Sequence, residues 1–260
     1  MNNTLTYRPV AEVRASGLSA LGTLALLSCL AVACGGGSSP TSPTPVPTPT
    51  PTPAPTPTPP PGPSFHTVDL GPIANGRESN ISSPIGRRTF AGVPFEMGSG
   101  QFAAFIRQHE GHPEYPTEAT LALSAGSANL VHVLLTGVYV VSVAASRTVG
   151  DITLSFADGG VLTVPIVSWS TFREGWRYTD EPARVMTAPA PPVTWDNVFE
   201  QAQSRAGRPA VGLIDRITIQ IPENLTRVAL VSLRVRDTSS TTVQSVSPGM
   251  SVHAVTLESR

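Results

Sequence analysis

Residues 151–167 read DITLSFADGGVLTVPIV and decide the fold class of this chain. From Ile152 to Phe156 apolar residues alternate with polar ones, which is the two-residue period of a strand with one buried face. The Asp158-Gly159 pair interrupts this pattern, and a second apolar run follows at Val161–Val167. Two such runs joined by an Asp-Gly pair predict a β-hairpin, because this pair suits the positive φ angles of a tight turn.

The same alternation recurs along most of the chain after residue 64. In Arg227–Asp237 the apolar residues take every second position. Further candidate strands are Phe65–Leu70, Thr89–Phe95, Phe102–Arg107, Ala119–Leu123, Leu130–Leu135, Tyr139–Ala144, Leu213–Ile221 and Ser251–Glu258. About eleven strands separated by turn residues predict an all-β fold, a β-sandwich or jelly roll, over residues 65–260.

One stretch departs from strand periodicity and predicts a short helix. Thr194 can cap a helix over Trp195–Ala206, and Gly207 can end it. Trp195, Val198, Phe199 and Ala202 would share its buried face. We expect this helix to close one end of the sandwich.

The first residues are typical of a secretory signal. Arg8 and Arg14 precede the apolar run Leu18–Ala33, which is shorter than the ~20 residues that a membrane-spanning helix needs. Ala31-Val32-Ala33-Cys34 resembles the cleavage site of a bacterial lipoprotein signal, although Ala31 stands where that pattern prefers Leu. The resemblance implies that residues 1–33 are removed and that Cys34 is acylated. The alternatives are an ordinary signal peptide and acylation at Cys29.

Lipidation would make a bilayer the partner of Cys34, with palmitate-type chains as the anchor. The expected location is a bacterial cell envelope, at the outer membrane if the source has two membranes. Residues 34–64 then form a linker, because the regular prolines of Pro40–Pro63 favour an extended polyproline-II spacer of up to roughly 75 Å. A ligand for proline-binding modules and an O-glycosylated stalk are the alternative interpretations.

Composition excludes several classes of function. Charged residues make up 13% of the chain, the net charge is −1 and all 17 basic residues are Arg. Such a balance offers no basic face to phosphate, so we expect no nucleic-acid partner. After cleavage Cys34 is the only cysteine, and the folded domain would be held by its apolar core without disulfides.

Several short motifs resemble bacterial secreted β-sandwich modules of the galactose-binding-domain-like type, which accompany glycoside hydrolases. These motifs are Val68-Asp69-Leu70, Phe90–Phe95, Phe156–Gly160, Leu213–Ile219 and Ala254–Glu258. The resemblance implies a non-catalytic carbohydrate-binding domain, without cofactor or catalytic residues. The compact stretch Asn80–Arg88 departs from the longer Gly- and aromatic-rich loop of such modules.

Aromatic and basic residues are dense after the predicted hairpin. The candidate ligand-binding residues are Trp169, Arg173, Trp176, Arg177 and Tyr178. Aromatic faces can stack on the C–H faces of sugars while polar side chains bond the hydroxyls. In the alternative interpretation at least one of the two tryptophans belongs to the core, and we expect Trp176 to be the more exposed of the two.

Other reactive residues are weaker candidates. In His109-Glu110-Gly111-His112-Pro113-Glu114 the spacing and the Gly and Pro exclude a helical zinc-protease motif, leaving a loop metal site or a solvated loop. Asp215 shares a strand face with Ile217 and Ile219, so we expect it to be buried with a structural hydrogen-bond partner. No Gly-x-Ser-x-Gly elbow or phosphate-binding Gly/Lys loop occurs, and no metal or cofactor is expected.

Three hypotheses of function remain. The first is a lipid-anchored, non-catalytic envelope protein that binds glycan or another surface polymer. The second is an envelope assembly protein that binds another protein through a strand edge or apolar patch. The third is a hydrolase built on carboxylates drawn from Glu110, Glu114, Glu118, Asp180 and Glu181.

Overall fold

The structure is a computed structural model that describes residues 62–75, 85–98, 103–106, 116–124, 126–138, 140, 145–239 and 249–260. The described residues all belong to one compact unit, Pro57–Arg260. The predicted signal peptide and Cys34 lie outside the described residues, as does most of the predicted linker. Within the described ranges, no helix has the length and apolar character needed to cross a membrane.

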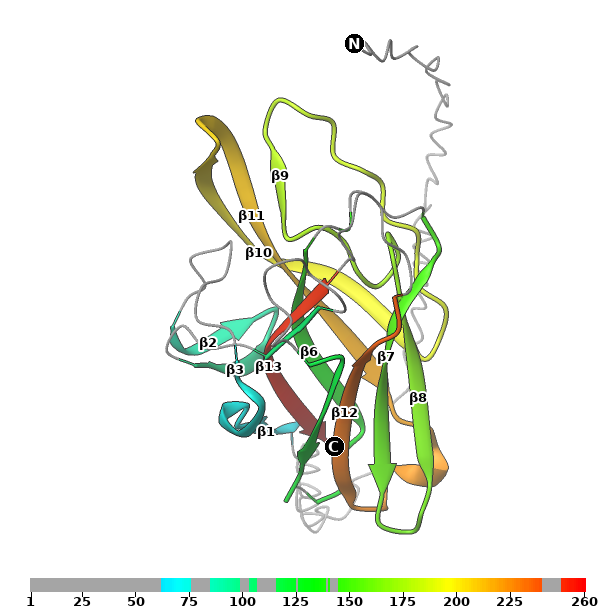
Figure 1. Cartoon of the computed structure of the whole chain (residues 1–260). Helices are drawn as coiled ribbons and strands as arrows, with labels where there is room; N and C mark the ends of the chain where they lie inside the picture. The colour runs from blue at the N-terminus through cyan, green and yellow to red at the C-terminus, as the bar shows by residue number, and fades with distance from the viewer. Residues whose placement is uncertain are drawn as a thin grey trace, which may run out of the picture. The chain divides into compact units, whose positions relative to one another are not determined.

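Two antiparallel sheets form the body of this unit, so the prediction of an all-β, sandwich-like fold is confirmed (Figure 1). The larger sheet has the order β1 (Ser64–Val68), β13 (Gly249–Ser259), β6 (Leu130–Val138), β11 (Arg208–Gln220), β10 (Val193–Arg205), with β4 (Ala103–Ile106) beside β13 and β9 (Trp176–Tyr178) beside β11. The smaller sheet has the order β5 (Glu118–Ala122), β12 (Leu230–Asp237), β7 (Thr148–Phe156), β8 (Val161–Val167).

The main core lies between these sheets and follows the predicted alternation. Val131, Val133 and Leu135 of β6 face Ile152 and Leu154 of β7 in one apolar cluster. The hairpin predicted from residues 151–167 is present as β7 and β8. In its turn Gly159 adopts a φ of 87°, and Asp158 Oδ1 accepts the Gly160 N–H at 2.8 Å.

A third layer covers the outer face of the larger sheet. β2 (Gly86–Phe90) and β3 (Val93–Met97) form a hairpin whose Phe95 is fully buried against Leu134 and Ile214. Residues 89–95 were predicted as one strand, and that prediction is wrong. Ala91 and Gly92 have φ angles of 46° and 81°, so the chain reverses there in a two-residue turn.

The predicted helix over Trp195–Ala206 is also wrong, because this stretch is strand β10 and pairs with β11 along its length. The four apolar residues that suggested a helix do not share a buried face. Trp195 packs against the main core, Val198 and Phe199 pack against the cluster around Phe95, and Ala202 is exposed, with a bulge between Asn197 and Phe199. Ala206 and Gly207, with φ angles of 49° and 74°, form the hairpin turn, and Gly207 does not end a helix. Described helical segments are short 3₁₀ turns such as Gly71–Ile73 and Glu223–Leu225.

The remaining predicted strands correspond closely to β1, β4, β5, β6, β11, β12 and β13, with ends shifted by a few residues. β9 was not predicted. Of the predicted strand Tyr139–Ala144, only Val140 lies among the described residues.

Gly150 is required where β7 passes β12. A Cβ atom at this position would lie 2.4 Å from the carbonyl oxygen of Arg236 and 2.6 Å from Met250 Cε. We expect Gly150→Ala to lower the free energy of unfolding by about 1–3 kcal/mol or more, since backbone must move to admit the methyl group. Denaturant unfolding measures this, with Gly126→Ala as control because no atom lies within 4 Å of its Cβ position. Equal stability of the two variants would contradict this packing.

Candidate functional site

A pocket of about 270 Å³ lies beside β9, where the loop after β8 meets β11. We call it the aromatic pocket. Its lining residues are Trp169, Arg173, Glu174, Trp176, Arg177 and Leu213, together with loop residues 181–184. Four of the five predicted binding residues therefore meet around one cavity. The fifth, Tyr178, packs edge-on against Trp176 with ring centroids 4.9 Å apart.

The two tryptophans differ in burial, as the core interpretation predicted. Trp169 is 6% exposed and belongs to the main core, with the Arg184 guanidinium 4.6 Å from its ring centroid. Trp176 is half-buried, and the Arg205 guanidinium lies 4.2 Å from its ring centroid. The aromatic wall is thus flanked by guanidinium groups, and it is not an open, flat platform.

A buried ion pair holds the pocket loop to the larger sheet. Arg173 Nε and Nη2 donate to the two carboxylate oxygens of Asp215, both at 2.8 Å. Asn197 Nδ2 donates to Asp215 Oδ1 at 3.0 Å. Asp215 is 3% exposed, which confirms the expected burial, and its partner is a loop arginine. Removing one partner of such a pair typically costs ~3–5 kcal/mol, because the other charge stays buried.

Backbone contacts place the same loop between β6 and β11. Gly175 N–H donates to Gly137 O at 2.8 Å, and Leu213 N–H donates to Gly175 O at 2.7 Å. A Cβ atom on Gly137 would lie 2.1 Å from Arg173 O, so only glycine permits this approach. Glu174, 4% exposed, accepts the Val140 N–H through Oε2 at 2.7 Å. The pocket floor is therefore fixed by main-chain geometry.

The strand edge beside the pocket carries a second aromatic and charged contact. The Arg208 guanidinium lies 3.7 Å from the ring centroid of Tyr178 and bonds the carboxylates of Asp180 and Glu181. The hydrogen bond that Arg208 donates to Asp180 is the main cause of a raised pKa at Arg208. Asp180 and Glu181, two carboxylates of the hydrolase hypothesis, are thus joined through one arginine.

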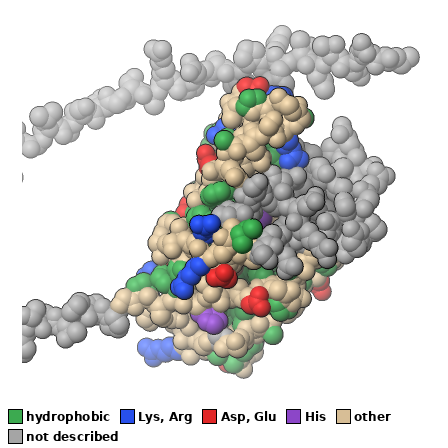
Figure 2. All heavy atoms as spheres, turned by 90° about the vertical axis from the view of Figure 1, so that its left-hand side faces the viewer, with side chains coloured by type: hydrophobic (Ala, Val, Ile, Leu, Met, Phe, Trp, Pro, Cys, Tyr) green, Lys and Arg blue, Asp and Glu red, His purple; other side chains and the backbone are tan. Residues whose placement is uncertain are grey.

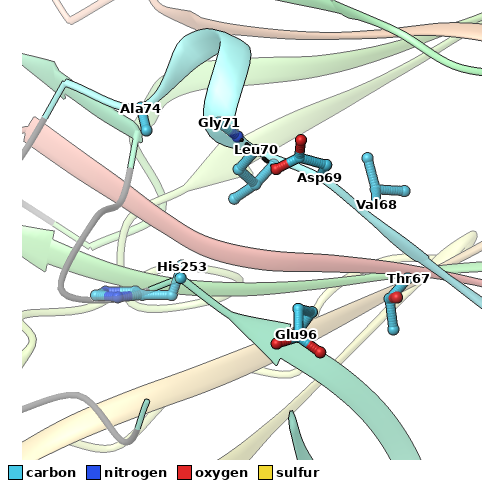
Figure 3. Close-up of a pocket in the computed structure, with 9 residues that line it drawn as sticks. Thr67, Val68, Asp69, Leu70, Gly71, Ala74, Glu96 and His253 are labelled. Atoms are coloured by element: carbon cyan, nitrogen blue, oxygen red, sulfur yellow. Dashed lines mark hydrogen bonds between the residues drawn. The ribbon is translucent and has the colours of Figure 1, made fainter. Parts of the chain in front are cut away.

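A second pocket, of about 300 Å³, lies near the end of β1 and includes Asp69, Glu96 and His253 in its lining (Figure 3). Asp69 Oδ1 accepts the Gly71 N–H at 2.8 Å. The His253 ring points away from the carboxylates of Asp69 and Glu96 (Figure 3). It is hydrogen-bonded to Thr136 Oγ1 at 2.9 Å. The three side chains do not form an acid–base pair in this arrangement.

His253 occupies the bulge of β13, where the register with β6 shifts between Val252 and Ala254. It is 3% exposed, and burial lowers its pKa from 6.5 to about 4. The folded protein therefore keeps the ring neutral at pH values where the unfolded chain binds a proton. The contribution of His253 to the free energy of unfolding therefore falls as the pH drops from 6.5 toward 4.

We expect His253→Gln to remove this part of the acid sensitivity while keeping an amide nitrogen near Thr136. Between neutral pH and pH 4, wild type should lose about 3 kcal/mol more of its free energy of unfolding than the variant loses. Urea unfolding at closely spaced pH values measures it. Identical pH slopes in the two proteins would show that His253 does not titrate between these limits.

The other reactive candidates are only partly visible. The cluster from His109 to Glu114, which includes the two carboxylates Glu110 and Glu114 of the hydrolase hypothesis, lies outside the described residues. Where the structure is described, no three His, Cys, Asp or Glu side chains gather closely enough to hold a metal ion. On the face shown in Figure 2, arginine and acidic side chains are interspersed among small apolar patches.

Comparison with known proteins adds no relative, since no family, curated protein or solved structure matches the chain.

Proposed function

We propose that this chain is a lipid-anchored protein of a bacterial cell envelope whose β-sandwich binds carbohydrate, or another surface polymer, in the aromatic pocket. The observation that carries the proposal is the convergence of Trp169, Trp176, Arg173 and Arg177 on one cavity. These residues come from two segments, the loop after β8 and strand β9, and the fold brings them together beside β11.

The pocket has the composition that sugar recognition requires. Trp176 supplies a partly exposed aromatic edge against which an apolar sugar face can pack. The guanidinium groups of Arg177 and Arg184 supply donors for hydroxyl groups. Because the Arg173–Asp215 pair and the contacts of Gly137 hold the loop, little ordering cost is expected on binding.

The remaining parts of the proposal rest on the sequence. The Ala31–Cys34 junction supports acylation, and the regular prolines of Pro40–Pro63 support a spacer between membrane and domain. The resemblance to galactose-binding-domain-like modules supports a non-catalytic domain with a carbohydrate ligand. Under this proposal the anchor positions the pocket at a distance from the lipid.

Trp176→Ala tests the pocket. We expect glycan binding to weaken at least tenfold, because the variant lacks the aromatic surface against which the sugar packs. The cost in stability should stay below the ~3–5 kcal/mol that truncation of a fully buried aromatic side chain causes. A glycan array followed by titration calorimetry measures the affinity. Phe90→Ala is the matched control, because Phe90 is also half-buried but packs on Phe95 and Phe199 and does not line the pocket. Unchanged affinity in Trp176→Ala would reject this pocket as the binding site.

Cys34→Ala tests the anchor. We expect the variant to lose the label from a radioactive fatty acid and to leave the membrane or accumulate as precursor, because the acylated thiol is absent. Stable membrane retention needs at least two acyl chains. Label that persists in Cys34→Ala would place acylation elsewhere, with Cys29 as the first candidate.

One observation favours the protein-binding alternative. Strand β10 is the last strand in its sheet, and among the described residues only β11 pairs with it. A long free edge can accept a strand from a partner protein. This alternative predicts an empty glycan array, so the measurement on wild-type protein separates the two functions.

A further inference from the structure

The charge around the aromatic pocket indicates the class of sugar, an inference that rests on the proposed function. Most partly buried arginines in the described structure have carboxylate partners. The pairs are Arg173–Asp215, Arg216–Asp196, Arg234–Asp151 and Arg236–Asp151. Two half-buried arginines, Arg177 and Arg205, have no carboxylate partner among the described residues. Arg177 lines the aromatic pocket, and Arg205 lies over the ring of Trp176 outside the lining.

A third guanidinium stands at the same place. Arg184 lines the pocket, and its contact within the described part of the chain is the ring of Trp169. Arg177 and Arg184 therefore bring to the pocket positive charge that is not paired with a described carboxylate, and of the two Arg177 is half-buried and Arg184 exposed. Burial removes water from a charge, so a partly buried guanidinium without a partner favours an anion from outside the protein.

Neither acidic residue of the pocket forms an ion pair with Arg177 or Arg184 within the described part of the chain. Glu181 bonds Arg208, which itself lies over Tyr178 outside the lining. Glu174 is 4% exposed, and its Oε2 accepts the Val140 N–H.

We propose that the aromatic pocket binds an anionic glycan, with Arg177 engaging the carboxylate of a uronic acid unit. Arg184 adds positive charge beside Trp169. The planar guanidinium of Arg177 matches a planar carboxylate with two parallel hydrogen bonds, which favours uronates over sulfate esters. Neutral sugars would leave these arginines without a charged partner.

The first test uses the unmodified full chain in detergent with two polymers of one backbone. Polygalacturonate carries a carboxylate on each unit, and its methyl ester carries none. We expect at least tenfold tighter binding of the acid form, weakening as salt rises. Dextran sulfate tests whether charge alone suffices, and binding as tight as that of polygalacturonate would overturn the assignment to uronates.

The second test removes the proposed contact. Arg177→Gln should weaken polygalacturonate binding at least tenfold and leave binding of the methyl ester unchanged. Arg227→Gln is the charge-matched control, because Arg227 is exposed and follows the far end of β11 from the pocket. A thermal melt of each variant verifies folding, and the comparison of acid with ester on wild type does not depend on any variant.

The outcomes separate this inference from the proposed function. Equal binding of acid and ester, with Arg177→Gln unaffected, overturns the anionic class and leaves glycan binding in place. Equal losses in Arg177→Gln and Arg227→Gln show nonspecific charge attraction and overturn the inference as well. No binding of any glycan, neutral or acidic, overturns both.

Discussion

The buried pair of Arg173 and Asp215 is the interaction on which the candidate site depends. It joins the loop after β8 to β11 through two 2.8 Å hydrogen bonds, and Asn197 fills a further acceptor position on the carboxylate. A pair this buried gains little over apolar packing, but it is costly to break, so it specifies one position for the loop. Gly137 permits that position by allowing the Arg173 backbone against β6.

The larger sheet lies between two apolar clusters, and this burial on both faces shapes the rest of the fold. Its inner face packs on the four-stranded sheet, and part of its outer face is covered by the β2–β3 hairpin. Such strands carry apolar residues toward both faces, as in Val133, Leu134 and Leu135. A rigid middle layer gives β11 a fixed place, and β11 in turn carries Asp215 and Leu213 to the pocket.

Rigidity and unmatched charge together make the pocket suited to a ligand. The loop is held by main-chain hydrogen bonds and one ion pair, so its aromatic and basic groups are in place before binding. Most other half-buried arginines in the described structure are paired with a carboxylate, whereas Arg177 in the pocket is not. Selective retention of charge at one cavity is the physical basis of the proposed preference for acidic glycans.

Local patterns by themselves determined the all-β class, the hairpin at 151–167 and the burial of Asp215, because alternation of apolar and polar residues reports on one strand at a time. Closeness in the sequence was enough to group Trp169, Arg173, Trp176 and Arg177. Only the tertiary structure decided that Trp195–Arg205 is strand, since its apolar residues are divided between two clusters and the stabilising partner is β11. It also decided that Arg173 meets Asp215 and that Arg177 stays unmatched. Those outcomes depend on which distant strands become neighbours, and no local propensity encodes that choice.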